Sequence, residues 1–196
     1  MLNRRRFLKS SALSLAYGIS GASALATPLP HRRSWSNWAG NVTAHPERLL
    51  RPQNLPEVIK ALATSDKARA FGSGHSFNAA AVSSGAMLDA KAFRGRIGEV
   101  QRDGRLQVPG SILLKDLYLQ LEKKGRAIPS MGTTDLQTLA GAMANGTHGT
   151  GVQWGSLSDA GQIAGLEVVS ARGEILRFEH QSKADQAYLK ALRLNL

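Results

Sequence analysis

Cysteine is absent from this chain of 196 residues. Its absence excludes disulfide bonds, thiolate metal sites, cysteine nucleophiles and a thioether link to a cofactor. Aromatic residues make up only 6% and charged residues 20% of the sequence. Because 42% of the residues are hydrophobic, the composition is that of a globular protein with one ordinary core. Packing alone must therefore hold the fold.

A formal charge of +11 raises nucleic-acid binding as a hypothesis. Four of these charges, Arg4, Arg5, Arg6 and Lys9, lie in an N-terminal segment that we expect to be removed. The other basic residues are scattered, without the interleaved aromatic residues of a single-strand binder or the density of a recognition helix. We interpret them as a solvated surface and expect no nucleic-acid partner.

The N-terminus has the layout of an export signal. Residues 3–9 read NRRRFLK, an apolar and uncharged stretch follows over residues 10–24, and the small-residue pattern Ala-Leu-Ala ends at Ala26. This order predicts a twin-arginine signal, with Asn3 in place of the usual Ser or Thr. The alternatives are an ordinary secretory signal and a membrane anchor. The anchor is disfavoured because the apolar stretch holds Ser, Gly and Tyr and is shorter than the roughly 20 residues of a span. We expect cleavage after Ala26, a periplasmic or secreted protein, and no membrane span after cleavage.

The remaining chain predicts a short leader and N-terminal segment over residues 27–45, followed by one domain over residues 46–196. Residues 35–41, WSNWAGN, hold two of the three tryptophans, and we expect them to pack as the edge of a lid. Short mixed elements, without repeats or regular βαβ alternation, indicate an α+β fold. Helices are expected over residues 54–65, 113–124 and 182–194, strands over 68–71, 86–89, 97–101 and 105–108, and a hairpin over 163–170 and 174–178.

Two glycine-rich loops carry the candidate chemistry. Residues 72–78 read GSGHSFN and residues 145–151 read NGTHGTG. Small residues allow backbone N–H groups to approach a ligand such as a diphosphate. His75 adds a nucleophilic imidazole to the first loop, and Thr147 and Thr150 add hydroxyl donors to the second.

Other readings of these loops are weaker. Residues 141–147 have the glycine spacing of a P-loop but lack its lysine, and neither loop has the GxGxxG pattern of a Rossmann fold. We expect no metal site, because no cysteine or acidic residue lies at a ligand spacing from His75 or His148. Residue types alone leave His75 evenly balanced between a nucleophile and a structural hydrogen-bonding group, whereas they favour a structural His148.

Three ordered segments together resemble a known family. Residues 72–78, 137–151 and 155–175 are similar to the FAD domain of the vanillyl-alcohol oxidase and para-cresol methylhydroxylase (PCMH) superfamily, and within it to sugar-lactone and alditol oxidases. The resemblance runs from about Trp38 to Leu194. It implies a PCMH-type FAD-binding domain built of two small α/β lobes.

The same resemblance implies FAD as the cofactor, joined covalently through the imidazole of His75 to the 8α-methyl group of the flavin. Residues 131–134 are expected near the flavin, and the lack of cysteine excludes a doubly attached form. Alanine at position 142, often serine in alditol oxidases, favours an aldonolactone as substrate. The cofactor-binding residues implied are Ala70, Phe71, Gly72, Ser73, Gly74, His75, Ser76, Gly141, Ala142, Thr147, Thr150 and Gly151.

The activity implied is oxidation of a CH–OH group of a sugar lactone or related polyol, with hydride transfer to flavin N5 and oxygen or a respiratory carrier as electron acceptor. Relatives of this kind continue past the position of Leu196 into a substrate domain. We therefore expect this chain to be incomplete at its C-terminus and its catalytic residues to lie mainly in that missing domain. Two alternatives stay open: an inactive flavin-binding fragment, and a periplasmic module that binds another phosphate ligand without redox chemistry.

Overall fold

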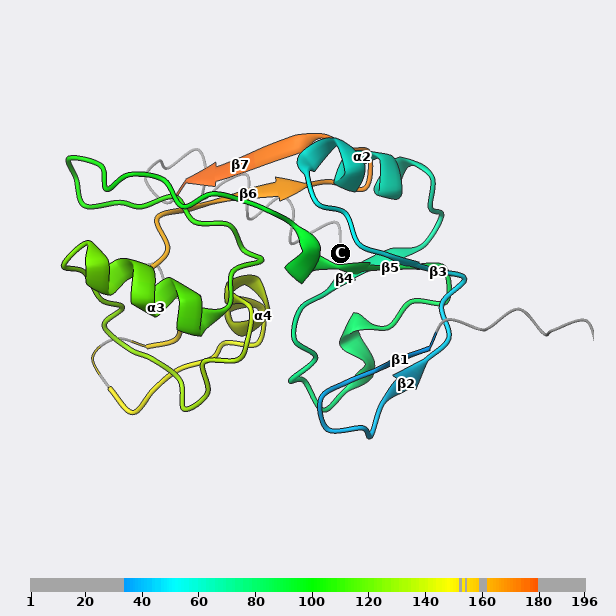
Figure 1. The fold of residues 1–196 in the computed structure, drawn as a ribbon, viewed down its shortest axis with the longest axis horizontal. Helices are drawn as coiled ribbons and strands as arrows, with labels where there is room; N and C mark the ends of the chain where they lie inside the picture. Colours follow the sequence, from blue (N-terminus) through cyan, green and yellow to red (C-terminus); the bar gives the residue numbers. More distant parts are fainter. Residues whose placement is uncertain (1–33, 152, 154, 159–161, 180–196) are drawn as a thin grey trace, which may run out of the picture. The chain divides into compact units, whose positions relative to one another are not determined.

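The computed structural model describes residues 34–151, 153, 155–158 and 162–179 (Figure 1). The predicted export signal and the predicted helix over residues 182–194 lie outside the described residues, as does the first part of the leader. All elements described below belong to one compact unit.

A three-stranded parallel sheet forms the first layer of the fold (Figure 1). Strands β3 (Arg48–Leu50), β5 (Ala86–Asp89) and β4 (Ala68–Phe71) lie in that order, and Ala86 pairs with both Arg48 and Ala68. The predicted bounds of β4 and β5 are confirmed, whereas β3 is a strand that the sequence did not predict. Strand β5 is central and buried along Ala86, Met87 and Leu88, as expected of a parallel strand covered on both faces.

Helix α2 (Leu55–Ala63) connects β3 to β4 and confirms the helix predicted there. Its start is fixed by a reciprocal cap: the Glu57 N–H donates to Asn54 Oδ1 over 3.0 Å, and the Gln53 N–H donates to Glu57 Oε2 over 2.8 Å. Pro56 occupies the first turn, where a missing N–H costs nothing. The buried Ala61 packs with Ala86 and Leu88 and so fixes the helix on the sheet.

A short antiparallel pair precedes the sheet. Strand β1 (Trp35–Ser36) pairs with β2 (Thr43–Ala44), and the turn between them contains residues 37–42. Ala44 is buried against Phe71 and Met87, and the ring of Trp35 meets that of Phe71 edge to face at 5.5 Å. The β1–β2 turn is thereby placed beside the end of β4, where the loop of residues 72–78 begins.

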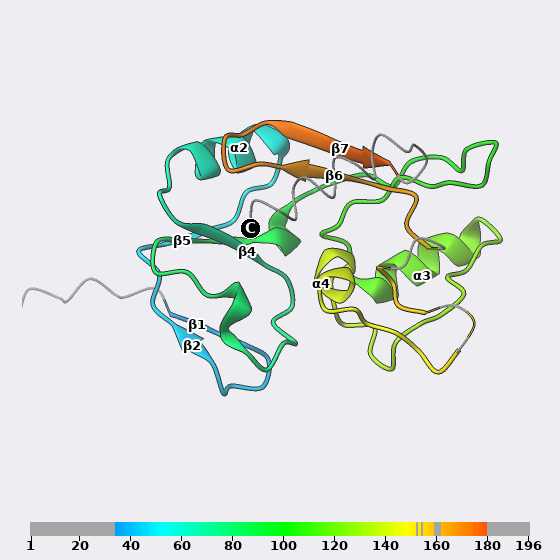
Figure 2. The same ribbon diagram turned by 180° about the vertical axis from the view of Figure 1, so that it is seen from behind.

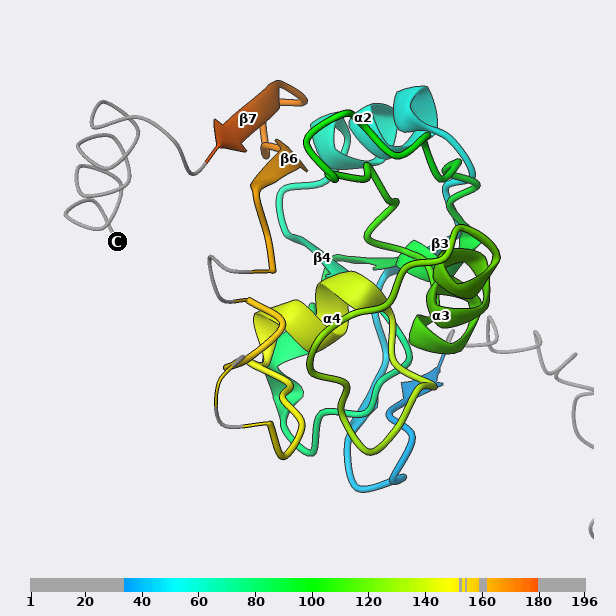
Figure 3. The same cartoon turned by 90° about the vertical axis from the view of Figure 1, so that its left-hand side faces the viewer.

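Two helices share a second core (Figure 3). Helix α3 (Leu114–Lys123) buries Leu114, Leu117 and Leu121 against a cluster that includes Leu139 and Ala142 of helix α4 (Leu139–Ala144). Helix α3 confirms the helix predicted over residues 113–124, and Gly125 with φ +64° follows its end, as in a glycine C-cap. From the sequence, residues 139–144 were predicted as part of a loop, so helix α4 was missed.

The two strands predicted over residues 97–101 and 105–108 do not form as regular strands. The turn is present, since the Gly104 N–H donates to the Gln101 carbonyl over 2.9 Å. Hydrogen bonds between the two arms join Gly98 to Gln107 and Gln101 to Arg105, so residues 99 and 100 of one arm oppose residue 106 alone on the other. That change of register interrupts the ladder before regular strands can form.

The second hairpin is confirmed, with slightly shifted bounds (Figure 2). Strand β6 (Gly165–Val169) pairs with β7 (Ile175–Glu179) through five residue pairs, and the turn uses Gly173 at φ +80°. Short 3-10 turns at Ala79–Ala81 and Ala90–Ala92 complete the described elements. No helix in the described ranges is long and apolar enough to cross a membrane.

Candidate functional site

The first glycine-rich loop follows directly from β4 and exposes backbone donors. Within the described part of the chain, the N–H groups of Ser73, Gly74 and His75 donate no hydrogen bond. The Ser73 hydroxyl is buried and likewise has no partner among the described residues. Three consecutive amides and a hydroxyl without acceptors suit the oxygens of a diphosphate. By this test the loop fits the group that the resemblance implies.

The carbonyl groups of the same loop are held by the β1–β2 turn. The Trp38 N–H donates to the Gly74 carbonyl over 2.9 Å, and Asn37 Nδ2 donates to the Ser76 carbonyl over 2.9 Å. His75 lies between these two anchored positions and is half-buried. The loop therefore has fixed carbonyls on one side and unpaired N–H groups for a ligand.

The second glycine-rich loop begins at the end of α4. The Thr147 N–H donates to the Ala142 carbonyl over 2.9 Å, and Gly146 adopts φ +62° to make that turn. Farther along, the Gly149 N–H donates to Ser130 Oγ over 3.1 Å. Several amides of this loop thus bond protein groups, so it is a more self-contained structure than the first loop.

Thr138 joins the first loop to helix α4. Its side chain is only 2% exposed, and its Oγ1 accepts a hydrogen bond from the Gly141 N–H over 3.3 Å. A Cβ atom added at Gly72 would overlap the same Oγ1 atom. Gly72 and Gly141, both predicted cofactor-binding residues, therefore lie on either side of one buried hydroxyl. Gly72 is required here by its contact with Thr138, and a cofactor contact at Gly72 stays a prediction.

The other predicted residues fall into different environments. Ala142 is 0% exposed and packs in the core of α3 and α4, so its methyl group faces protein atoms. Phe71 is buried in the sheet core, whereas Ala70, Thr150 and Gly151 are exposed. A cofactor contact by these residues stays a prediction.

Sequence reasoning missed Thr138, Asn37 and the stacking of Trp38 on His75. The indole and imidazole centroids are 5.1 Å apart, and the two rings are inclined by 24°. A Thr before the apolar run Leu139-Ala140 is a cap signal that could have pointed to Thr138. No local pattern reports the contact of Trp38 with His75, because 37 positions separate them in the chain.

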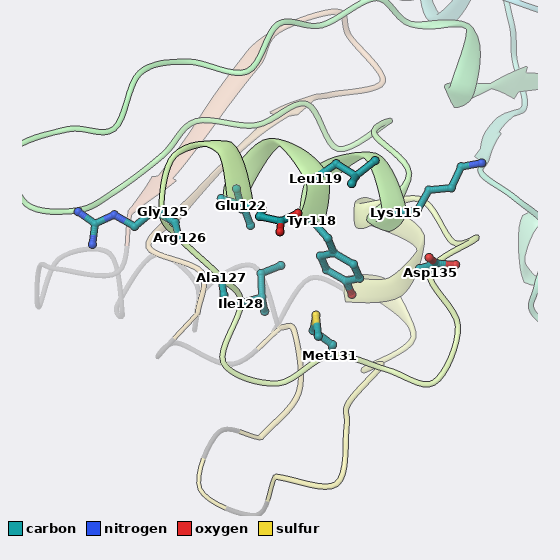
Figure 4. Close-up of a pocket in the computed structure, with 11 residues that line it drawn as sticks. Lys115, Tyr118, Leu119, Glu122, Gly125, Arg126, Ala127, Ile128, Met131 and Asp135 are labelled. Carbon is teal, nitrogen blue, oxygen red and sulfur yellow. The ribbon is translucent and has the colours of Figure 1, made fainter.

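A separate pocket of about 700 Å³ lies along α3 (Figure 4). Its walls are mainly apolar, with Leu119, Ile128 and Met131 among them. The Tyr118 hydroxyl is buried and has no hydrogen-bond partner in the described structure. Burial, and secondly the negative charge of Asp135, raise the pKa of this phenol. The twelve predicted cofactor-binding residues do not line this pocket, whereas Met131, one of the residues expected near the flavin, does. Among the residues described, no cluster of three or more His, Asp or Glu side chains could hold a metal ion.

Known proteins resemble the chain at both the sequence and the structural level. L-gulono-1,4-lactone dehydrogenase of Mycobacterium tuberculosis is 35% identical over 146 residues, which cover 72% of this chain and 34% of that protein. L-gulonolactone oxidase of Mus musculus is 32% identical over 167 residues, covering 83% of this chain and 37% of that protein. A putative D-arabinono-1,4-lactone oxidase of Neurospora crassa is 31% identical, covering 76% and 27%. The chain thus spans about a third of the length of these relatives.

Solved structures share the fold. A solvent-stable cholesterol oxidase superposes with a TM-score of 0.59 at 23% identity, over 74% of this chain and 32% of that one. A cholesterol oxidase from B. sterolicum gives a TM-score of 0.62 at 16% identity. These likenesses confirm the predicted α+β fold of a PCMH-type FAD-binding domain.

A family model described as FAD binding domain matches residues 46–179. The chain therefore belongs to the family of FAD-binding domains, of the PCMH type found in oxidoreductases.

Proposed function

We propose that this chain is the flavin-binding part of an FAD-dependent oxidoreductase that oxidises a CH–OH group of a sugar lactone or a related polyol. The names of the relatives from M. tuberculosis, M. musculus and N. crassa, all of which refer to sugar lactones, support this substrate class. Bound FAD supplies a two-electron acceptor, with hydride transfer to N5. Dioxygen or a respiratory carrier then takes the electrons from the flavin.

The observation that carries the proposal is the first glycine loop. Its unpaired N–H groups and the Ser73 hydroxyl hold the diphosphate of FAD, and His75 lies directly beside them. The loop matches GSGHSFN, the segment on which the resemblance to covalent flavoproteins rests. A module for an unrelated phosphate ligand would have no need of an imidazole held at this position.

Covalent attachment at His75 is the second part of the proposal. An imidazole nitrogen of His75 bonds to the 8α carbon of the flavin. The imidazole loses its N–H proton and the methyl carbon loses one hydrogen. The two electrons released enter the isoalloxazine, and dioxygen or another two-electron acceptor removes them, giving hydrogen peroxide in the case of dioxygen. The step therefore balances with FAD and such an acceptor as the co-reactants.

The cellular setting is proposed on sequence grounds. A twin-arginine signal over residues 1–26 suits a protein that receives its cofactor before export, since that route carries folded proteins. We propose a periplasmic or secreted location, a short N-terminal segment to residue 45, and the FAD domain after it. The base that accepts the substrate hydroxyl proton is expected in the part of the relatives beyond the matched region.

A denaturing gel tests attachment, and a reduction assay tests activity. The wild-type chain is expected to leave a fluorescent flavin band after denaturation, and His75→Ala to leave none. A matched His148→Ala variant should keep the band. Bleaching of the flavin by an aldonolactone would support turnover by this chain alone. Attached flavin without bleaching would favour the inactive fragment, and absence of any bound flavin would favour the non-redox binding module.

A further inference from the structure

The β1–β2 turn donates hydrogen bonds to three carbonyl groups of the His75 loop, those of Gly74, Ser76 and Phe77. The Trp38 N–H donates to the Gly74 carbonyl over 2.9 Å, and Asn37 Nδ2 donates to the Ser76 carbonyl over 2.9 Å. Asn41 Nδ2 donates to the Phe77 carbonyl over 3.0 Å. Two of these bonds flank His75 directly. The backbone on both sides of the imidazole is therefore fixed by a segment almost 40 residues earlier in the chain.

Asn37 anchors this set of hydrogen bonds. It is 5% exposed, and each end of its amide is used. Besides the bond to Ser76, its Nδ2 donates to Asn41 Oδ1 over 2.7 Å, and its Oδ1 accepts from the Val42 N–H over 3.0 Å. A buried amide with both donors and its acceptor satisfied has one stable orientation. The turn thus presents the neighbouring residue, Trp38, in a defined direction.

The indole ring of Trp38 covers one face of the His75 imidazole. The indole stacks on the imidazole at 5.1 Å, and the ring of Phe77 meets the indole edge to face at 6.5 Å. Trp38 is nevertheless 65% exposed, so burial of apolar surface does not account for its place. Gly74 at φ +70° allows the approach, because a Cβ there would lie 3.3 Å from both the Asn37 Cα and the Trp38 nitrogen.

We propose that Trp38 and Asn37 are positioning residues for flavin attachment. The stack limits the rotation of the imidazole, so that a nitrogen of His75 is already oriented when FAD occupies the loop. Orientation before reaction raises the rate of bond formation by removing the need to order the reacting group. This inference rests on the covalent attachment proposed above and adds the residues that set its rate.

The first test is the kinetics of attachment in the full chain. Apoprotein is mixed with FAD in air, and the covalently modified fraction is followed by intact mass under denaturing conditions. Trp38→Leu keeps an apolar side chain but removes the stacked ring, and we expect attachment to slow by about tenfold. Trp38→Phe keeps a ring and should restore most of the rate. Leu119→Ala, an exposed apolar residue on α3, is the control and should attach FAD at the wild-type rate.

Affinity must be separated from orientation. Non-covalent FAD binding is measured for His75→Ala and for His75→Ala combined with Trp38→Leu, and the two dissociation constants should agree within about twofold. A tenfold loss of affinity in the double variant would make Trp38 a binding contact and overturn the inference. Equal attachment rates in wild type and Trp38→Leu would overturn it as well, while leaving the proposed function intact. Absence of covalent FAD on the wild-type protein would instead overturn the attachment itself, and the inference with it.

A second readout needs no flavin. In the apoprotein labelled at its histidine rings, the indole ring current should shift the His75 ring protons upfield in the NMR spectrum. Trp38→Leu should abolish that shift, and Asn37→Ala should reduce it because Trp38 loses its fixed direction. His75 ring protons at the same position in wild type and Trp38→Leu would show that the rings do not stack in solution, and would overturn the proposal.

Discussion

Gly72 lies against the hydroxyl of Thr138, so closely that a Cβ atom at position 72 would overlap Thr138 Oγ1. The contact joins the end of β4, where the first glycine-rich loop begins, to the start of α4. It brings the end of a sheet strand against the helical core at the predicted cofactor site.

Gly72→Ala should therefore destabilise the protein by about 1–3 kcal/mol, the usual cost of inserting a methyl group into a packed site. Urea unfolding of the apoprotein measures the change. Gly98→Ala is the matched control, because a Cβ at Gly98 finds only ordinary contacts at 3.5 Å or more. Combining Gly72→Ala with Thr138→Ala should cost less than the sum of the two single changes. Additive effects would show that the two residues do not touch.

The core shared by α3 and α4 predicts a contrast between two leucines of one helix. Leu114 is fully buried, whereas Leu119 is exposed. Leu114→Ala should lower the free energy of unfolding by about 2–5 kcal/mol, since it leaves a cavity between the helices. Leu119→Ala should change it by no more than about 0.5 kcal/mol. Similar losses for both variants in thermal or urea unfolding would contradict the packing described.

The cap of α2 predicts a smaller loss. Asn54→Ala removes the acceptor of the Glu57 N–H, and a lost N-cap of this kind costs about 1 kcal/mol. Asn54→Ser keeps an acceptor and should stay close to wild type in the same unfolding experiment. Equal stability of Asn54→Ala and wild type would show that the cap does not hold the helix start.

Tyr118 predicts a pH dependence with a definite sign. Burial and the charge of Asp135 raise the pKa of the phenol above 10.0, its value in an unfolded chain. Above that pH the unfolded chain loses a proton that the native protein keeps, so unfolding becomes more favourable as pH rises. The stability difference between wild type and Tyr118→Phe should be constant below pH 10.0 and change in favour of the variant above it. A stability difference between wild type and Tyr118→Phe that is the same below and above pH 10.0 would contradict the raised pKa of Tyr118. Asp135→Asn should move the tyrosinate absorbance change to lower pH.

Local sequence patterns predicted the elements that depend on local chemistry. Strands β4 and β5, helices α2 and α3, and the β6–β7 hairpin follow from apolar runs, Asn54 with Pro56, and glycines at positive φ. Helix α4 was missed because it is only six residues long and contains Gly141, and its formation depends on tertiary packing. The hairpin over residues 97–108 failed because one extra residue in one arm breaks its register.

The candidate site divides in the same way. Residue types indicated the two loops and His75, since a glycine-rich loop with a histidine is a local pattern. The residues that hold the loops, Asn37, Trp38 and Thr138, act through contacts between distant parts of the chain. The tryptophan-rich segment is a local feature of the sequence, but its contact with His75 depends on the position of β1 and β2 beside the end of β4.

The most direct test of covalent attachment is peptide mapping by mass spectrometry. Trypsin separates the two loop histidines, because residues 70–91 contain only His75 and residues 127–172 contain only His148. The protein is purified with its flavin, denatured, digested and sequenced by fragmentation. We predict that the flavin mass lies on peptide 70–91 and on its histidine. Flavin on the peptide of residues 127–172, or only free FAD after denaturation, would contradict the assignment of His75.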